Sequence, residues 1–444
     1  MAKRRRRRQL PEPSVVRIEA MSHEGRGIAH IDGKTVFVFG AIEGEQVRIQ
    51  IRKTSRNFDE AITLDVIEPS TLRIKPKCEA YEVCGGCSLQ HIVNDEQVAF
   101  KQCSLLEMMQ HAGIEIGEVI PPIRSHPWGY RRKARLGVKF VRKKGRVLVG
   151  FRERNTPFLA DMSRCEVLIP RVGNHLRDLA NLIESLDARE AIPQIEVASD
   201  DSHVALVFRH LMPLSKGDRE KLVDFAKHND VWVQLQPGGP DSIVNLYPRQ
   251  QVLHFAPLQN EDININFDAV DFTQVNAEIN QQMVAQALHY LDLNEDDRVL
   301  DLFCGLGNFS LPMARRCLKV TGVEGDAPMV GRAKQNALEH SIDNSEYFVA
   351  DLSRPDPEIG WMREQYDKIL LDPPRLGALE IAQYIPRFDA ETIVYISCQP
   401  ASLVRDSKII CDSGYRCTHL GIMDMFPHTA HVESMTVFKR ATNC

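Results

Sequence analysis

The sequence predicts a multidomain α/β protein with a small N-terminal β-barrel, a mixed and mainly β central domain, and a C-terminal doubly wound domain. A length of 444 residues exceeds one ordinary domain of roughly 100–200 residues. Short β-type runs separated by glycines occupy residues 13 to 68. From about residue 270, helical stretches alternate with short apolar runs, a pattern typical of a parallel sheet covered by helices.

The composition restricts the class of protein. The chain is 43% hydrophobic and 26% charged, which is ordinary for a soluble globular protein, and no run approaches the roughly 18 apolar residues of a membrane helix. No apolar stretch follows the basic N-terminus before Pro11, so we expect no secretory signal and a cytoplasmic location. The 11 cysteines are an odd number, which favours metal-binding or catalytic thiols over a disulfide framework.

Positive charge is concentrated in two places. The net charge is −5, and Lys3 with Arg4 to Arg8 contributes +6, so the remainder carries −5 − 6 = −11. We expect residues 1–12 to form a basic disordered tail. Residues 124–154 contain twelve Lys or Arg against Glu153, with four aromatic residues interleaved. This pattern predicts a surface that follows nucleic-acid phosphates, with the aromatic residues as stacking partners; a merely solvated, charged hairpin is the alternative.

Residues 13–69 form the predicted barrel, which we expect to be antiparallel. Short strand-like runs at this spacing are typical of such a fold, and the runs are Val15 to Ile18, Gly25 to Ile28, Thr35 to Val38 and Gln46 to Ile51. The stretch from Gly25 to Ile51 resembles the TRAM domain, an OB-like RNA-binding barrel attached to RNA-modifying enzymes. A small barrel can also serve as a structural cap.

Residues 70–268 are interpreted as the central domain. A linker at Pro69 to Pro76 precedes it, and residues 95–112 are expected to form a helix that packs on the catalytic domain. A second helical stretch lies near residues 173–186. The predicted strands are residues 134–141, 147–151, 204–208 and 231–235.

Residues 269–444 form the predicted doubly wound domain, in which ligands bind at the carboxyl ends of the strands. The first strand, Arg298 to Leu302, runs into a loop with Gly305 and Gly307, and the second ends at Glu324, placed for ribose hydroxyls. A dinucleotide site is the alternative, although Ser310 occupies the position of its third glycine.

This order of elements is similar to the Rossmann-like class I S-adenosylmethionine methyltransferases. The resemblance implies that the first loop holds the amino acid part of S-adenosylmethionine, Glu324 the ribose and Asp351 the adenine side. The loop residues concerned are Phe303, Gly305, Gly307 and Asn308. For Asp351 the alternative is a plain helix N-cap.

Two further strands end in reactive groups. The fourth ends in Asp372-Pro373-Pro374 and the fifth in Ser397-Cys398-Gln399-Pro400. Asp-Pro-Pro alone would suit an amine-methylating enzyme. Carbon 5 of uracil is a poor nucleophile, however, and addition of a thiolate to carbon 6 activates it; a base must then remove the carbon 5 proton. A buried, inert cysteine is the alternative for Cys398.

The stretches Leu371 to Ala378, Ile396 to Pro400 and His431 to Ser434 resemble the RNA uracil-5-methyltransferase family across essentially the whole chain. The resemblance implies that Cys398 is the nucleophile and Glu433 the base, with Asp372 and Gln274 lining the pocket where methyl donor and uracil meet. Gln399 departs from the Asn usual in that family. His428 and His431 are alternative candidates for the base.

Cys78, Cys84 and Cys87 form a compact thiolate group with Gly85 and Gly86 between the last two. A fourth thiol, Cys165, matches the branch of the family that carries a 4Fe-4S cluster. Zinc on the same four thiolates is the alternative, because both centres accept this ligand set.

A barrel together with a cluster resembles the branch that acts on 23S ribosomal RNA. The expected partner is therefore 23S ribosomal RNA, with S-adenosylmethionine as methyl donor and a monomeric enzyme. The alternatives are a tRNA or other ribosomal RNA uridine methyltransferase and a non-catalytic RNA-binding protein. The sequence does not identify the uridine that is methylated.

Overall fold

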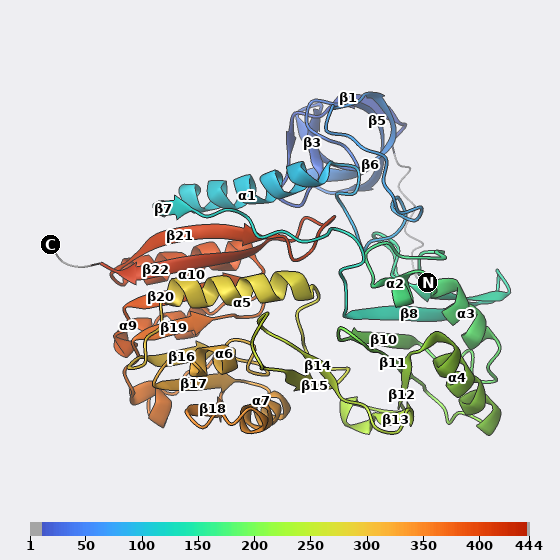
Figure 1. The fold of residues 1–444 in the computed structure, drawn as a ribbon. Coiled ribbons are helices and arrows are strands. Elements are labelled where there is room, and N and C mark those ends of the chain that lie inside the picture. Colours follow the sequence, from blue (N-terminus) through green and yellow to red (C-terminus); the bar gives the residue numbers. More distant parts are fainter. Residues whose placement is uncertain (1–10, 442–444) are drawn as a thin grey trace, which may run out of the picture.

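The computed structural model describes residues 11–441, so most of the predicted basic tail at residues 1–12 lies outside the described residues. Figure 1 shows a small barrel above two larger bodies, one built on the central sheet and one on the C-terminal sheet. The predicted multidomain α/β fold class is confirmed. Within the described residues, no helix combines the length and apolarity needed to cross a membrane.

The barrel sheet has the strand order β1-β5-β6-β4-β3-β2. Buried residues alternate along β4 and β5, as expected for strands with one face in a core. The sequence pattern predicts an antiparallel barrel, but β4 pairs with β6 in parallel. The strands are β1 (Ser14–Arg17), β2 (Ala20–Met21), β3 (Gly27–Ile31), β4 (Lys34–Phe39), β5 (Gln46–Thr54) and β6 (Phe58–Glu68).

The central sheet has the order β13-β12-β11-β10-β8-β9, and α2, α3 and α4 lie beside it (Figure 1). A core of apolar side chains from these strands and helices holds them together. The strands are β8 (Ala134–Val141), β9 (Arg146–Gly150), β10 (Gln194–Ser199), β11 (Val204–Arg209), β12 (Trp232–Gln236) and β13 (Val244–Tyr247). The helices are α2 (Pro170–Gly173), α3 (Leu176–Glu184), α4 (Lys216–Asn229) and the short η1 (Pro240–Ser242).

A two-stranded ladder of β14 (Leu253–Phe255) and β15 (Ile265–Phe267) connects this body to the C-terminal sheet. That sheet has the order β18-β17-β16-β19-β20-β22-β21-β7. Its strands are β16 (Arg298–Leu302), β17 (Lys319–Glu324), β18 (Ser345–Val349), β19 (Lys368–Leu371), β20 (Thr392–Ser397), β21 (Tyr415–Met423), β22 (Glu433–Arg440) and β7 (Ile116–Val119). The strands β16 to β20 are parallel, as predicted, whereas β22 runs antiparallel to both neighbours.

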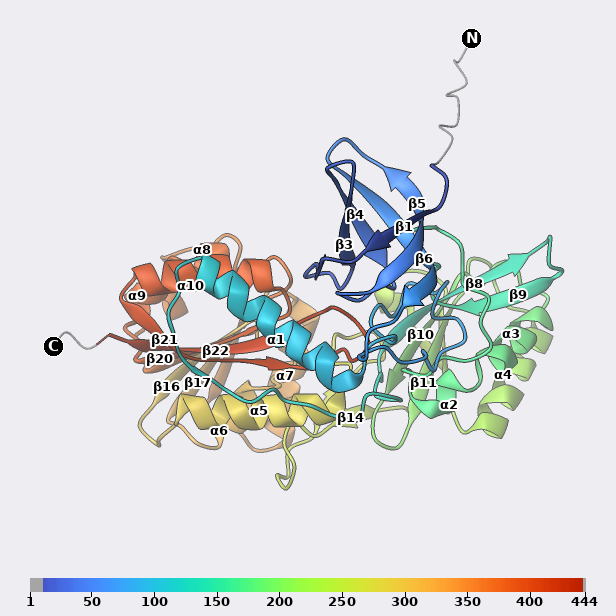
Figure 2. The same ribbon diagram turned by 90° about the horizontal axis from the view of Figure 1, so that it is seen from above.

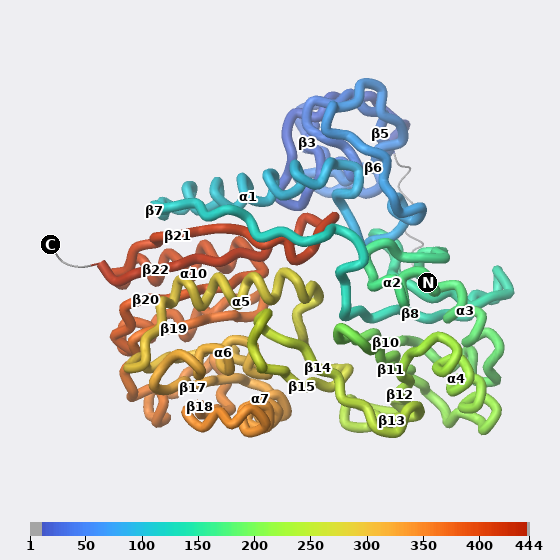
Figure 3. The backbone as a smooth tube through the Cα atoms, in the orientation of Figure 1, coloured from blue at the N-terminus to red at the C-terminus, as the bar shows by residue number. Residues whose placement is uncertain are grey.

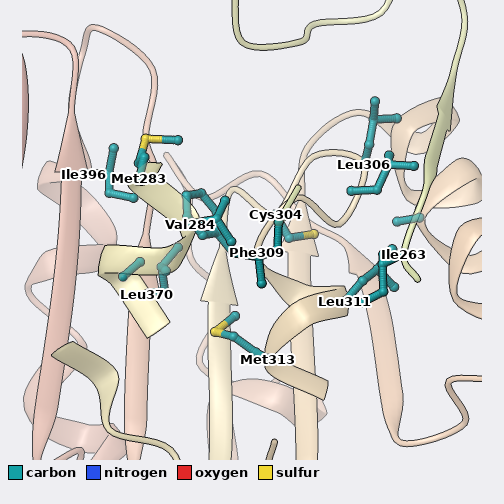
Figure 4. Packing of buried hydrophobic residues seen from close by; sticks show 14 of the residues in the cluster. Ile263, Met283, Val284, Cys304, Leu306, Phe309, Leu311, Met313, Leu370 and Ile396 are labelled. Atoms are coloured by element: carbon teal, nitrogen blue, oxygen red, sulfur yellow. The ribbon is translucent and has the colours of Figure 1, made fainter. Parts of the chain in front are cut away.

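Helices cover both faces of the C-terminal sheet and create two apolar cores. Figure 4 shows part of one core, where Met283 and Val284 of α5 lie near Leu370 and Ile396 of the sheet. The helices are α5 (Ala277–Leu291), α6 (Ser310–Ala314), α7 (Ala327–Glu339), η2 (Gly360–Arg363), α8 (Leu379–Ala382), α9 (Ile385–Phe388) and α10 (Pro400–Asp412). A sheet buried on both faces explains why its parallel strands read as continuous apolar runs.

The segment between the barrel and the central sheet joins the C-terminal sheet. Helix α1 (Asn94–His111) lies along that sheet, as Figures 2 and 3 show. Strand β7 pairs in parallel with β21. The buried Lys101 donates to the Asp424 carboxylate at 2.6 Å and to the Phe426 carbonyl at 3.1 Å. Since a buried ammonium without a partner is costly, this ion pair holds α1 to the segment that leads into Glu433.

Candidate active site

One cavity of about 1180 Å³ opens at the carboxyl ends of the central parallel strands. The structure brings both predicted reactive residues, and every predicted cofactor residue except Gly307, to its wall: Gln274, Phe303, Gly305, Asn308, Glu324, Asp351, Asp372, Cys398 and Glu433. Parallel strands end at one edge of a sheet, so loops far apart in sequence meet there. The volume is large enough for two ligands of nucleotide size.

The loop after β16 has an unusual backbone. Phe303, Gly305 and Gly307 have φ angles of +66°, +54° and +93°, a region that non-glycine residues enter at a cost of roughly 1–3 kcal/mol. The Phe303 N–H donates to the Val323 carbonyl at 2.8 Å and holds the turn against β17. Gly307 shapes the loop from outside the cavity lining. The strained phenylalanine is therefore presented to the cavity.

Glu324 connects this loop to the next one. Its carboxylate accepts hydrogen bonds from the Gly305 N–H at 3.2 Å and the Asp326 N–H at 3.0 Å. The amide of Asn308 forms a reciprocal pair with the amide of Asn280 on α5, at 3.0 and 2.9 Å. These bonds fix two polar groups of the cavity wall before any ligand binds.

Asp351 lies in a turn after β18, and no helix begins there within the described chain. Its carboxylate accepts from the Ser353 N–H at 3.0 Å and from the Ser353 hydroxyl at 2.6 Å, and these bonds lower its pKa. The N-cap interpretation is therefore wrong. The side chain stays charged at the rim of the cavity.

The sheet register places Cys398 opposite Glu433. In the antiparallel ladder between β20 and β22, Ser397 pairs with Ser434. Cys398 directly follows Ser397 and Glu433 directly precedes Ser434, so the two reactive residues flank the last pair of this ladder. The carboxylate of Glu433 lies close enough to the Cys398 thiol to raise its pKa. Cys398 is half-buried, and Glu433 is buried. Both side chains line the cavity.

The acidic groups of the cavity raise one another's pKa values. Burial and the nearby carboxylates of Glu433 and Asp372 raise the pKa of Cys398 to about 12. Burial and Asp372 likewise raise the pKa of Glu433 to about 8. The guanidinium of Arg375 opposes both shifts. A cavity that disfavours additional negative charge suits a cationic ligand.

The two histidines have different surroundings. His431 lines the cavity, where partial desolvation and the charge of Arg375 lower its pKa. His428 is buried outside the cavity lining, with a φ of +67° and its ring stacked on Trp128 at 3.8 Å. Its carbonyl accepts from the Ser88 and Leu89 N–H groups at 2.8 and 2.9 Å. His428 therefore supports the chain, and His431 alone of the two could reach a substrate.

A second cavity of about 250 Å³ is lined by all four predicted cysteine ligands, Cys78, Cys84, Cys87 and Cys165. Burial raises the pKa of each thiol, and burial together with the neighbouring thiols raises that of Cys87 to about 12. Within residues 11–441, no three metal-ligating side chains are grouped closely enough for a single ion. Four thiols around one shared space fit a group with several metal atoms.

Arg154 stabilises the cysteine loop. Its guanidinium donates to the carbonyls of Cys84 and Cys87 at 2.8 and 2.7 Å, and it lies over the ring of Phe39 in the barrel at 3.5 Å. The two cavities are neighbours, because Arg131, Arg375, Phe426 and His431 line both.

Six of the twelve cations of the basic stretch form ion pairs within the described part of the protein. Their partners are acids that lie 15 to 69 residues away in sequence, such as Glu196 for Arg135 at 2.9 Å. Ion pairs also hold Arg124, Arg132, Arg142, Lys144 and Arg146. No ion pair within the described residues involves Lys139 or Lys143 on the hairpin. The net positive surface is therefore smaller than the sequence suggests.

The cavity wall also contains Arg375 and Phe272, for which the sequence predicted no role. Arg375 follows Asp-Pro-Pro directly, so its adjacency to that motif was the available signal. Phe272 is 67% exposed although it is aromatic, and it lines the cavity beside Gln274. An exposed aromatic residue at a cavity mouth can stack on a base.

A family model described as tRNA (Uracil-5-)-methyltransferase matches residues 199–441, and a TRAM domain model matches residues 15–64. A protein of Alkalilimnicola ehrlichii named 23S rRNA (uracil(1939)-C(5))-methyltransferase RlmD is 49% identical, over 98% of this chain and 99% of that relative. A protein of Legionella pneumophila with the same name is 46% identical over 96% of this chain and 97% of its own length.

The solved structure of Pyrococcus abyssi tRNA (uracil-54, C5)-methyltransferase in complex with S-adenosyl-L-homocysteine has a TM-score of 0.71. It is 20% identical and covers 96% of this chain and 100% of its own, so it shows the fold alone. The predicted class I methyltransferase fold and the TRAM barrel are confirmed. The chain therefore belongs to the uracil-5-methyltransferase family and carries a TRAM domain at its N-terminal end.

Proposed function

We propose that the protein transfers a methyl group from S-adenosylmethionine to carbon 5 of a uridine in 23S ribosomal RNA. The observation that carries the proposal is the opposed pair of Cys398 and Glu433 in a cavity shared with the predicted cofactor residues. The names of the relatives point to uridine 1939, and we propose the equivalent uridine as the target.

The methyl donor occupies the side of the cavity formed by the loop after β16. Glu324 holds the ribose, Asp351 lies at the adenine side, and Asp372 and Gln274 lie where the methyl group meets the base. S-adenosylmethionine supplies an electrophilic methyl group on a positively charged sulfur. Opposite charges attract strongly in a cavity shielded from water, so the carboxylates favour this cation over its neutral product.

The uridine swings out of the RNA into the remaining space, at a cost of roughly a few kcal/mol. The Sγ of Cys398, as thiolate, forms a bond to carbon 6 and converts the ring to an enolate. Carbon 5 then attacks the methyl carbon, and the bond from that carbon to the positively charged sulfur breaks, so that its electron pair stays on sulfur and S-adenosylhomocysteine leaves. Glu433 accepts the proton from carbon 5, and the electron pair of that C–H bond restores the ring double bond as the bond to sulfur breaks. The thiolate is released with the methylated base.

We expect kcat/KM to rise with pH between 6 and 9. The carboxyl group of Glu433 has a pKa of about 8 in the free enzyme, so it becomes able to accept a proton only as the pH rises through that value. The thiolate fraction of Cys398 also grows with pH, because its pKa of about 12 lies above this range. A pH profile of kcat/KM reports the free enzyme. A profile that falls between 6 and 9 would contradict these assignments.

Transfer of labelled methyl groups to ribosomal RNA tests the proposal directly. The substrate is 23S RNA from a strain deleted for the enzyme, with transfer RNA from the same strain as the competing substrate. We expect label as 5-methyluridine at one position of the 23S RNA. Label on an exocyclic amine, label on transfer RNA alone, or no label would each overturn the proposal.

We further propose that Cys78, Cys84, Cys87 and Cys165 hold a 4Fe-4S cluster. The support is the shared 250 Å³ cavity lined by four thiols, a ligand set that such clusters use. Four cysteine ligands leave no iron open to substrate. The residues around it, Arg154 among them, position the cysteine loop between the barrel and the catalytic cavity.

Replacement of Cys84 with serine should remove most of the bound iron and sulfide from anaerobically purified protein. The exposed Cys103 on α1 provides the control, since Cys103→Ser should keep the iron content of the parent. Iron and sulfide analysis, together with zinc analysis of the same samples, checks the result. Stoichiometric zinc without iron in the parent protein would favour the zinc alternative instead.

A further inference from the structure

Helix α10 holds the loop that carries Asp372, Pro373, Pro374 and Arg375. Helix α10 begins two residues after Cys398, and its residues Ser402, Arg405 and Asp406 lie three and four positions apart, on one helical face. The Ser402 hydroxyl donates to the Arg375 carbonyl at 3.1 Å. The Arg405 guanidinium donates to the Leu376 carbonyl at 2.8 Å.

Asp406 is the centre of this arrangement. Its side chain is completely buried and accepts three hydrogen bonds, from the Ala378 N–H at 2.7 Å, the Tyr395 hydroxyl at 2.7 Å and the Arg405 Nε–H at 2.8 Å. These donors belong to the loop, to strand β20 and to helix α10. One carboxylate therefore connects the loop bearing Asp372 to both elements that flank Cys398.

The local backbone is built for this close approach. Gly377 has a φ of +79°, and a Cβ at that position would lie 2.5 Å from a carboxylate oxygen of Asp406 and 2.7 Å from a guanidinium nitrogen of Arg405. Only glycine fits a position with both restrictions. Burial of a carboxylate is costly unless its hydrogen bonds are satisfied. The three donors satisfy the hydrogen-bonding needs of the Asp406 carboxylate and hold its side chain in one orientation.

We propose that Asp406 is a positioning residue of the methyl transfer reaction, which fixes Cys398 and the Asp372–Arg375 loop relative to each other. Asp406 is absent from the cavity lining and acts through the backbone. The proposal rests on the proposed function, because it concerns the reactivity of Cys398. The ionisable groups that influence that thiol are Glu433, Asp372 and Arg375. A displaced loop moves Arg375, the one cation among them, away from the thiol.

The test compares Asp406→Asn with Asp218→Asn. Asp218 is also a buried carboxylate, in the central domain, and it accepts from the backbone N–H groups of Asp187 and Ala188 at 2.8 and 3.2 Å. RNA containing 5-fluorouracil traps the adduct of Cys398, so the single-turnover trapping rate per folded enzyme can be measured from pH 6 to 9. Thermal unfolding of both variants measures their stability.

Because a misplacement of 1 Å can cost about 100-fold in rate, we expect Asp406→Asn to slow trapping by about 10- to 100-fold and to move its pH dependence to higher pH. Asp218→Asn should lower stability but keep the parent trapping rate and pH profile. An Asp406→Asn enzyme with the parent rate and pH profile overturns the proposal, whatever its stability.

If Asp406→Asn does not fold, Tyr395→Phe and Ser402→Ala decide the question, because each removes one hydroxyl of the arrangement. Slower trapping with an alkaline shift in either variant supports the proposal, and the parent rate and profile in both overturn it. Failure of the parent enzyme to be trapped at all overturns the proposed function as well, and that result is recognised without any variant.

Discussion

Replacement of Cys398 with alanine should abolish both methyl transfer and trapping by RNA that contains 5-fluorouracil. Without the thiol, no bond forms at carbon 6, and carbon 5 keeps the low nucleophilicity of free uracil. We expect a loss of turnover of at least roughly 10⁴-fold, about 5.4 kcal/mol of activation free energy at about 1.36 kcal/mol per factor of ten. Single-turnover assays and denaturing gels measure the two effects.

The matched control is Cys411→Ala, on helix α10, which begins shortly after Cys398. Cys411 is half-buried and lies outside the cavity lining, so its removal should preserve turnover and trapping. Binding of S-adenosylmethionine to Cys398→Ala should also be retained. Substantial methyl transfer by the alanine variant would mean that the base is activated without a covalent bond, as in an amine-methylating enzyme.

Replacement of Glu433 with glutamine should separate methyl transfer from product release. The variant lacks the base that removes the carbon 5 proton, and general bases contribute about 10²–10⁴-fold to such steps. The carboxylate of Glu433 also raises the pKa of Cys398, so its removal favours the thiolate. We therefore expect a covalent complex of enzyme and methylated RNA to accumulate on ordinary uridine, with slow turnover.

Denaturing gels with label in the methyl group detect this complex, because protein, RNA and methyl label should migrate together. Glu391→Gln is the control, since Glu391 is an exposed carboxylate near the opposite end of β20, paired with Lys368 at 3.3 Å. It should turn over normally. If Glu433→Gln turns over at the parent rate without accumulating a complex, the base is another group, and His431 is the next candidate to replace.

Chemistry that depends on residues close together in the chain could be predicted from the sequence. The glycine loop after β16, the Asp-Pro-Pro motif and Cys398 each follow an apolar strand directly, and the parallel pattern places all three at one edge of the sheet. Cys78, Cys84 and Cys87 could also be predicted as one group, because they lie within ten residues of the chain. Local sequence specifies such sites because one turn or one strand end creates them.

Features that depend on contacts between distant parts of the chain could not be predicted from the sequence. The pairing of β4 with β6 in parallel depends on how the barrel closes, and the strand β7 joins a sheet whose other strands lie about 180 residues or more further along the chain. The basic stretch looks like a free cationic surface in sequence, but acids from other elements neutralise much of it. A local sequence pattern cannot show which distant acidic residue will form an ion pair with a given cation.

By itself, the sequence determined the fold class, the family and the thiol on which the proposed reaction depends, since each follows from periodicity or a short motif. The resemblance implied Glu433 as the base, but only the tertiary structure shows how Glu433, His428 and His431 lie relative to that thiol. The register of β20 against β22 brings Glu433 beside Cys398, and the strained turn at His428 directs that histidine toward Trp128 and away from the cavity. Reactivity depends on distances of a few ångströms between distant segments, and packing alone sets those distances.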